Sequence, residues 1–455
     1  MNIFIAGDGE VGFYIAEALV NSNHDITIID PHEELLKMVE THTDLLTIVG
    51  ESNSVGVLKQ AGVDKADLVI SVLHDETVNI ITSILAKKLG AKNTIARVNT
   101  LQHLSSENLK VYEELGVDYM ISPEDISGHE VVNLIKNPQV YDMFNLSNDK
   151  LSVYLIKIEN GAPVSNKTLI DIAKEHGPLN FRAVAINRDQ SSFIPTGTSS
   201  FKEGDMVYVV SKPDSLDDLL NLAGKKKYEI SNIMVVGGGR VGKVICRELE
   251  NDYNIKLIES DSERCHSLTD ILTDTLLING DARNVDLLDE EGIENTDVFI
   301  AVTNSSETNI LTCLHAKKFG VKKTIALVEN LDYIEISQNI GIDTILNKKL
   351  TAASNIVMHA MGNEVSSLKK CLSGINSDIV ELVAMKGSQV TKKPIRDLKI
   401  PDGSVIGGII RGNESFIAVG DFQINEGDKV VVFALPGIIS KVEKMYQKTG
   451  FGFNS

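Results

Sequence analysis

Two glycine-rich segments are the residues whose types and spacing most clearly indicate chemistry. Gly7–Gly12 reads GDGEVG, and Gly237–Gly242, 230 residues later, reads GGGRVG. Each segment follows a short apolar run and precedes a stretch typical of a helix. In that setting the first glycine permits a tight turn, the second lets a pyrophosphate approach the backbone, and the third lets helix and strand pack closely. Both segments therefore predict loops that present free N–H groups to the phosphates of a nucleotide.

Two carboxylates add to this prediction. Asp30 and Glu259 each end the next apolar run, about 20 residues beyond the glycines, where a carboxylate accepts hydrogen bonds from the adenine ribose hydroxyls. A 2′-phosphate would meet a like charge there, so NAD or NADH is favoured over the phosphorylated form. ATP or ADP satisfies the same contacts. The alternative is that the motifs are only tight turns and the carboxylates only solvated strand ends.

The rest of each crevice is expected at the carboxyl ends of neighbouring strands. Arg97 can bind a diphosphate bidentately, whereas its counterpart Leu327 cannot, so the two crevices are predicted to be chemically unequal. Arg97 can also be a surface cation on a sheet edge, and His74 an incidental polar residue. Arg240 stands where the first motif has Glu10, and it either clamps phosphate or reflects drift. The other strand-end segments are Gly50-Glu51, Leu73-His74-Asp75, Gly280-Asp281 and Thr303-Asn304-Ser305.

An internal duplication positions these residues. Besides the glycine motifs, Ala86–Gly90 recurs as Ala316–Gly320 at the same offset of 230, and so does the tripeptide TIA that begins at Thr94. In each repeat the first part alternates short apolar runs with helical stretches, which predicts a parallel sheet covered by helices on both faces. In the first repeat, strands buried on both faces are expected at 2–6, 25–29, 45–49, 68–72, 94–98 and 119–121.

The second part of each repeat has a different pattern. Leu151–Leu155 alternates polar and apolar residues, and Glu203–Asp205 reads EGD, as Glu426–Asp428 does in the second repeat. This pattern predicts a small α+β unit rich in antiparallel strands. The lysines of Gly224–Lys227 are expected in a solvated linker. The fold class is thus α/β, with two Rossmann-like doubly wound parallel-sheet domains at 1–135 and 231–365, each followed by an α+β domain, at 140–222 and 370–448.

Composition excludes several functions. The 455 residues carry 63 acidic and 44 basic side chains, a net charge of -19, which argues against a general nucleic-acid binder.

The four cysteines lie far apart, show no metal-ligand spacing and are expected to be reduced and mostly buried. No metal site is predicted. The longest apolar stretch, Val430–Ile439, is too short to cross a bilayer, and export is not indicated.

Catalytic residues do not accompany the glycine motifs. A dehydrogenase needs a proton-transfer group beside the nicotinamide, yet under the repeat register His74 faces Asn304 and His315 faces Leu85. Nucleophile-elbow, H-E-x-x-H and Walker lysine motifs are also missing. A loop that binds a ligand without consuming it suits a sensor, so a non-enzyme is predicted. The alternatives are a soluble NAD-dependent oxidoreductase and a scaffold that binds nothing.

The whole arrangement resembles the TrkA family, the regulatory subunits of Trk potassium-uptake systems, which carry tandem RCK (regulator of potassium conductance) N and C domains. The resemblance implies a cytoplasmic protein on the inner face of the cell membrane that binds NAD(H) and adenine nucleotides. It also implies a homotetrameric ring that gates a membrane-embedded Trk-type potassium transporter. By this resemblance, nucleotide contacts are expected at Gly7, Asp8, Gly9, Glu10, Val11, Asp30, Leu73, His74 and Arg97, and at Gly237, Gly238, Gly239, Arg240, Val241, Glu259, Gly280 and Asp281.

Overall fold

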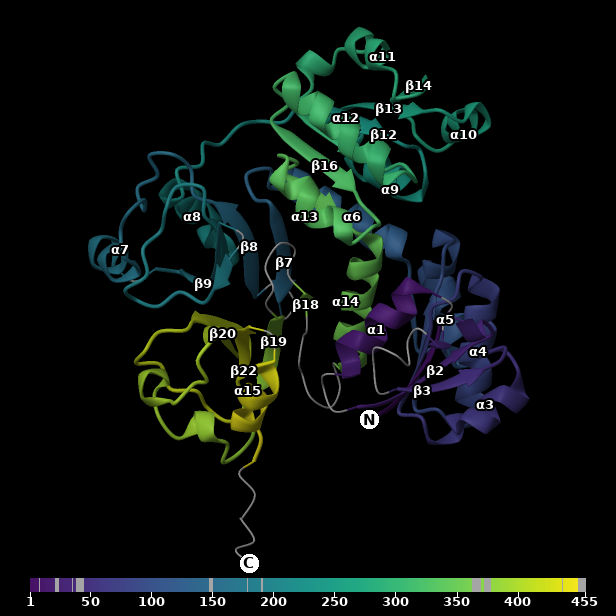
Figure 1. The fold of residues 1–455 in the computed structure, drawn as a ribbon, viewed down its shortest axis with the longest axis horizontal. Coiled ribbons are helices and arrows are strands. Elements are labelled where there is room, and N and C mark those ends of the chain that lie inside the picture. The colour runs from purple at the N-terminus through teal and green to yellow at the C-terminus, as the bar shows by residue number, and fades with distance from the viewer. Residues whose placement is uncertain are drawn as a thin grey trace, which may run out of the picture. The chain divides into compact units, whose positions relative to one another are not determined.

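The described residues form two compact units. The computed structural model describes residues 1–7, 9–20, 24–34, 36–37, 45–146, 150–177, 179–189, 191–361, 370–371, 378–435 and 437–448. The first unit comprises residues 1–129, 239–245 and 346–360, and the second comprises 130–238, 246–345 and 361–455 (Figure 1). No helix of the described part combines the length and apolarity that a membrane crossing requires. The four predicted domain limits stay predictions.

A six-stranded parallel sheet forms the first half of the first repeat, with strand order β3-β2-β1-β4-β5-β6. Its strands are β1 Asn2–Ala6, β2 Asp25–Asp30, β3 Leu46–Val49, β4 Leu68–Ser71, β5 Asn93–Arg97 and β6 Tyr119–Ile121. The connecting helices include α1 Glu10–Val20, α3 Val55–Ala61, α4 Glu76–Leu89, α5 Ser106–Leu115 and α6 Pro123–Lys136. The six predicted strands are therefore confirmed to within about one residue at each end.

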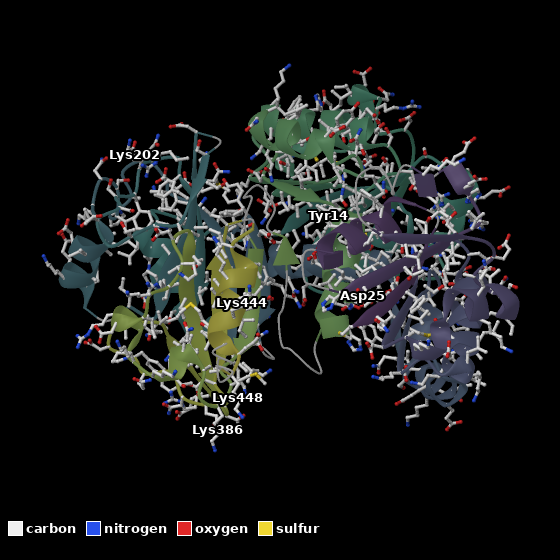
Figure 2. All side chains as sticks on the ribbon, turned by 60° about the horizontal axis from the view of Figure 1, so that its bottom comes forward. Tyr14, Asp25, Lys202, Lys386, Lys444 and Lys448 are labelled. Carbon is white, nitrogen blue, oxygen red and sulfur yellow. The ribbon has the colours of Figure 1, made fainter. Side chains whose placement is uncertain are left out.

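One expectation for this sheet is wrong. Strand β3 is not buried on both faces, since Leu46 is 60% exposed and Val49 is 54% exposed. The strand order places β3 at the edge of the sheet, where it pairs only with β2 among the described strands. An apolar run alone does not distinguish an edge strand from a central one. The exposed Asp25 begins the neighbouring β2 (Figure 2).

The second repeat has the same parallel arrangement, with strand order β14-β13-β12-β15-β16-β17. Its strands are β12 Asn232–Val236, β13 Asn254–Glu259, β14 Leu276–Asn279, β15 Val298–Ala301, β16 Lys323–Leu327 and β17 Thr344–Leu346. The helices are α9 Arg240–Leu249, α10 Ser262–Leu268, α11 Val285–Glu290, α12 Ser306–Lys318, α13 Asp332–Asn339 and α14 Lys348–Met361. In both sheets the strand order reverses at the first strand, which places the crevice beside β1 and β12.

Two five-stranded antiparallel sheets follow, with orders β10-β9-β11-β8-β7 and β18-β19-β22-β20-β21. The first comprises β7 Asp142–Leu146, β8 Leu151–Lys157, β9 Phe181–Arg188, β10 Ser191–Phe193 and β11 Met206–Ser211, with helices α7 Leu169–His176 and α8 Leu216–Leu222. The second comprises β18 Lys370–Cys371, β19 Asp378–Val383, β20 Ser404–Arg411, β21 Glu414–Ile417 and β22 Lys429–Ala434, with α15 Ile439–Tyr446. The predicted fold class is confirmed.

The two antiparallel sheets pack on each other within the second unit. Leu151, Val210 and Phe433 belong to one buried apolar cluster that draws on both sheets. Gly407 and Gly408 of β20 allow the close approach, because a Cβ atom there would lie 2.7 Å from Val210 and 2.5 Å from Leu151. The paired α+β domains thus share one buried apolar cluster, and the second has a further cluster of its own.

The duplicated EGD turns have a structural role. Asp205 is 1% exposed and accepts hydrogen bonds from Arg188 Nε at 2.7 Å and Nη2 at 2.6 Å. Asp428 accepts the equivalent bonds from Arg411 at 2.9 and 2.7 Å. Each aspartate also accepts a backbone N–H three residues earlier in its turn; in the first turn that N–H belongs to Lys202, which is labelled in Figure 2. These bidentate pairs fasten each turn to a central strand.

One of the three interdomain lysines differs from the expectation of a solvated linker, whereas Lys226 and Lys227 are exposed. The side chain of Lys225 is only 11% exposed, because it pairs with Glu159 and lies 4.7 Å from the ring centre of Tyr141. Three of the four cysteines, Cys246, Cys265 and Cys313, are buried free thiols, and the side chain of Cys371 lies outside the described residues. Burial raises the pKa of both Cys246 and Cys313, so these thiols stay protonated and unreactive at neutral pH.

Candidate nucleotide-binding site

The first glycine turn lies at the carboxyl edge of the first parallel sheet. A Cβ atom on Gly7 would lie 3.0 Å from the Val72 side chain and 3.2 Å from Gly12 Cα, so strand β1 and helix α1 approach closely at these glycines. Gly9 is exposed, and a Cβ atom there would meet no atom within 4 Å. The turn thus combines tight packing at its two ends with open backbone between them, the geometry that a pyrophosphate needs. Asp8 and the side chain of Glu10 lie outside the described residues.

Asp30 ends β2 beside this turn and is only 1% exposed. Its Oδ1 accepts hydrogen bonds from the backbone N–H of His32 at 2.7 Å and from the His32 ring at 3.0 Å. Its backbone carbonyl also accepts the N–H of Gly50, which follows β3. The interpretation of Asp30 as a solvated strand end is therefore wrong, and its carboxylate is held in one place at the edge of the crevice.

A buried amide fixes the neighbouring strand ends. Asn79, fully buried in α4, donates to the carbonyls of Leu73 at 2.8 Å and Arg97 at 2.9 Å, and accepts the N–H of Leu73. His74 is exposed, and its carbonyl accepts a hydrogen bond from Asn99. Asp75 caps α4 by accepting the N–H groups of Thr77 and Val78. One side chain therefore sets the spacing between β4 and β5 at their carboxyl ends.

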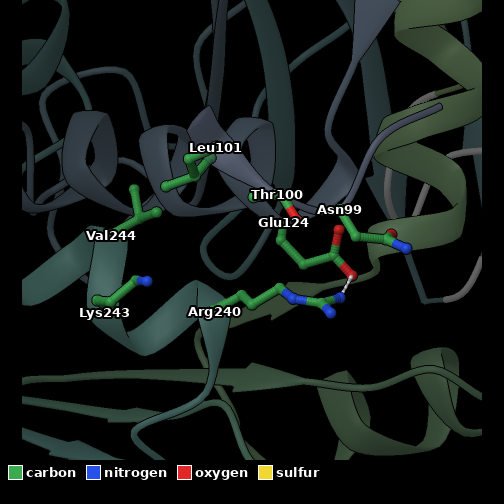
Figure 3. A pocket seen from close by; sticks show the side chains of 7 residues that line it. All are labelled: Asn99, Thr100, Leu101, Glu124, Arg240, Lys243 and Val244. Atoms are coloured by element: carbon green, nitrogen blue, oxygen red, sulfur yellow. Dashed lines mark ion pairs between the residues drawn. The ribbon is translucent and has the colours of Figure 1, made fainter. Parts of the chain in front are cut away.

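A small charged pocket lies at the same edge, after β5 and β6. It has a volume of about 150 Å³ and is lined by Asn99, Thr100, Leu101, Glu124, Arg240, Lys243 and Val244 (Figure 3). Arg240 points at Glu124, with Nη1 3.8 Å from Oε1, and Arg97 Nη2 lies 3.9 Å from the same oxygen. The guanidinium of the second glycine motif therefore lies beside a carboxylate of the first repeat.

Polar atoms of two residues that line this pocket, and of Arg97 beside it, have unused hydrogen-bonding capacity. Arg97 Nε, Asn99 Oδ1 and Glu124 Oε2 are buried and have no hydrogen-bond partner among the described residues. The Arg97 side chain is 13% exposed, so the interpretation of Arg97 as a surface cation is wrong. Buried polar groups without a partner are costly in a folded protein. Two guanidinium groups lie beside the single Glu124 carboxylate and Lys243 also lines the pocket, a positive excess that suits a phosphate, so the residues present fit a nucleotide.

The backbone of the second glycine turn is engaged by neighbouring groups of the protein. Gly237 has φ +104, and a Cβ atom there would lie 2.9 Å from the backbone N of Thr303. The N–H of Gly238 donates to Glu259 Oε2 at 2.8 Å, and the N–H of Asp261 donates to Oε1 at 2.8 Å. Glu259, only 4% exposed, is also no solvated strand end. Its carboxylate engages an N–H group that a bound phosphate would otherwise use.

Other residues predicted to contact a nucleotide in the second repeat also have partners within the protein. Asp281 accepts hydrogen bonds from Arg283 Nε and Nη2, and these bonds hold the pKa of Asp281 below its usual value. Gly280 packs tightly, since a Cβ atom there would lie 2.5 Å from Leu287. Leu327, the counterpart of Arg97, is a buried apolar residue. The polar groups around the two glycine turns therefore differ: Arg97 lies near the first, and its counterpart at the second is apolar.

Comparisons with known proteins agree with this arrangement. The TrkA-N domain description matches residues 3–123 and 233–348, and the TrkA-C domain description matches 153–224 and 379–447. A Trk system potassium uptake protein TrkA homolog from Methanosarcina mazei is 33% identical over 456 residues, covering 98% of this chain and 100% of that protein. The chain belongs to the TrkA family.

Solved structures share the fold of this TrkA-family chain. The GsuK channel bound to NAD aligns with a TM-score of 0.61 at 16% identity, covering 98% of this chain and 78% of that one. GsuK bound to ADP aligns with a TM-score of 0.51 at 13% identity, covering 80% and 70%. At these identities the likeness establishes the tandem arrangement of Rossmann-like and α+β domains.

Sequence reasoning missed several residues that shape the TrkA-family crevices. Asn309 repeats the role of Asn79: it is fully buried and donates to the carbonyls of Thr303 and Leu327. The signal was available, because the two asparagines are 230 residues apart, the offset of the glycine motifs. Glu124 had no such signal, since its pairing with Arg240 joins residues 116 positions apart in different repeats.

Proposed function

We propose that this TrkA-family chain is a nucleotide-sensing regulatory subunit that gates a membrane potassium-uptake transporter. It binds NAD(H), and also ATP or ADP, without turnover. The observation that carries the proposal is the carboxyl-edge crevice of the first repeat, where the open Gly9 backbone, buried Asp30 and the unsatisfied Arg97 Nε occur together. The TrkA names of the relatives and the NAD-bound and ADP-bound titles of structures with this fold support it.

The residues act by binding and orienting the ligand. The Gly7 turn and the start of α1 would hold the pyrophosphate, and Asp30 would accept the ribose hydroxyls. Phosphate charge would draw the guanidinium groups of Arg97 and Arg240 away from Glu124. Because Arg240 begins α9, a change of its position would be carried along that helix. Ligands that differ in phosphate charge would then favour different states, and the ligand itself would remain intact.

The partner would be the cytoplasmic face of a membrane-embedded Trk-type transporter, with the chain assembled as a homotetrameric ring on the inner side of the membrane. Cytoplasmic loops of membrane proteins are rich in Lys and Arg. The net charge of -19 is complementary to such loops. The ring would transmit the nucleotide-dependent motion to the transporter gate.

A test separates this proposal from its alternative, a soluble NAD-dependent oxidoreductase. Purified protein incubated with NADH is expected to bind it saturably in equilibrium dialysis and to return it unchanged. The nicotinamide absorbance should stay constant in the presence of a panel of oxidised metabolites. Sustained loss of that absorbance with any metabolite would support the oxidoreductase, and failure to bind any adenine nucleotide would support a scaffold.

A further inference from the structure

A second polar cleft lies in the second unit, at the edge of its parallel sheet opposite to the glycine turn. It has a volume of about 570 Å³, within the range of small-molecule sites. Lys323 is the first residue of β16, and Asp343 directly precedes β17, so the cleft adjoins the amino ends of these strands. The glycine turn Gly237-Gly238 follows the carboxyl end of β12. The cleft is therefore separate from the nucleotide crevice.

Positive charge dominates this cleft. Two carboxylates line it, Glu159 and Asp343. Six lysines line it: Lys157, Lys225, Lys226, Lys317, Lys322 and Lys323. A formal excess of four positive charges in a chain of net charge -19 is the reverse of what random placement predicts.

The carboxylates do not neutralise all six lysines. Glu159 pairs with Lys225, and Asp343 pairs with Lys317 at 2.6 Å. Lys322 reaches outside the cleft to Asp297 at 2.8 Å. Among the described residues, no ion-pair partner is found for Lys157 or Lys226.

Lys323 is held in place without a carboxylate. It is 2% exposed, and its ammonium group donates to the carbonyls of Val140 at 2.6 Å, Pro138 at 3.3 Å and Leu134 at 3.5 Å. Burial lowers the pKa of Lys323 to about 7, with Asp343 opposing the shift. A nearby anion would favour the charged form of this side chain.

Two tyrosines position further ammonium groups. Lys225 lies 4.7 Å from the ring centre of Tyr141, and Lys322 lies 5.3 Å from that of Tyr228. Burial raises the pKa of both phenols above the usual value, so neither adds negative charge at neutral pH. The ammonium groups of Lys225 and Lys322 are therefore held in place beside uncharged aromatic rings.

The first repeat lacks this arrangement. At the positions equivalent to Lys317 and Lys322 it has Lys87, paired with Asp118, and Lys92, paired with Asp67. At the position of Lys323 it has Asn93, an exposed residue that donates to a backbone carbonyl. The buried lysine and the cleft thus distinguish the second repeat from the first.

We propose that this lysine cleft binds a small polyphosphate anion, a di- or triphosphate, as a second ligand site that is independent of the glycine crevices. Several preorganised ammonium groups without matching carboxylates suit an anion with several charges, and lysine binds phosphate as a point charge. A single phosphate would engage too few of the ammonium groups to bind comparably.

The test is isothermal titration of the full chain with inorganic tripolyphosphate at low ionic strength. Wild type is expected to bind one equivalent, and Lys157→Ala/Lys226→Ala to bind at least about tenfold more weakly, since hydrogen bonds to charged groups are lost. The charge-matched control Lys110→Ala/Lys174→Ala removes two exposed lysines elsewhere and should retain wild-type affinity. No binding by wild type, or an equal loss in both double variants, would overturn the proposal.

A second arm identifies the source of the phosphate. ATP is titrated into Asp30→Ala/Glu259→Ala, which removes the ribose-binding carboxylates of both glycine crevices and leaves the lysine cleft intact. ATP binding tighter than tripolyphosphate would assign the cleft to a nucleotide, and equal binding would assign it to the polyphosphate alone. NADH binding to the lysine variants reports on the glycine crevices separately, so failure of either site is distinguished from failure of the other.

Discussion

Replacing Asp205 by alanine should lower the free energy of unfolding of the first α+β domain by about 1.5–3 kcal/mol, because it removes charge-assisted hydrogen bonds to the Arg188 guanidinium, whose side chain is 21% exposed and keeps its bond to the Ser200 carbonyl. Asp205 is almost fully buried and makes two bonds to Arg188 and one to the turn backbone. A guanidinium stays protonated in proteins whether or not a carboxylate is nearby, so Arg188 keeps its charge in the variant. Hydrogen exchange of the β9 and β11 amides in the full chain measures the effect locally.

Two comparisons make this result specific. Asp214→Ala removes an exposed carboxylate from the same domain and should change the exchange rates little. Asp428→Ala should produce the same loss in β20 and β22, because Asp428 pairs with Arg411 in the same geometry. Exchange in Asp205→Ala that matches the Asp214→Ala control would show that the pair contributes no stability.

Asp30→Ala should weaken NADH binding at the first crevice by about 10- to 100-fold, because a hydrogen bond to a charged group contributes about 1.5–3 kcal/mol. Equilibrium dialysis is performed in a Glu259→Ala background so that the second crevice does not contribute. The matched control is Asp25→Ala, which removes an exposed carboxylate from the opposite end of the same strand, β2. Unchanged NADH affinity in Asp30→Ala would refute the assigned pocket.

The features that the sequence predicts well are local or repeated. Strands such as Asn2–Ala6 and Tyr119–Ile121 are short apolar runs next to glycine turns, so periodicity alone locates them. The repeat register, 230 residues at the glycine motifs and 223 at the EGD turns, then transfers each assignment from one repeat to the other. The exposure of the edge strand β3 could not be predicted in this way. Its composition is that of a central strand, and it is exposed only because the strand order places it at the edge of the sheet.

The features that the sequence does not predict depend on long-range packing. Arg240 belongs by sequence to the second glycine motif, yet its guanidinium lies beside Glu124. Lys323 reads as one of several lysines near a helix end, and only the fold buries it against the carbonyls of residues 134–140. The pairs that Arg188 and Arg411 form with aspartates depend on packing, but the sequence holds a signal for them. Each lies 17 residues before its aspartate, and this shared spacing could have predicted both pairs.

Potassium uptake into membrane vesicles that contain the Trk-type transporter tests the central claim most directly. Uptake is measured with and without the chain, and with NADH or ATP present. We expect the rate to depend on the chain and to differ between the two nucleotides by at least about fivefold, the lower end of typical allosteric coupling, and Asp30→Ala to abolish most of that difference. Uptake that responds to the chain equally under every nucleotide condition would contradict the account.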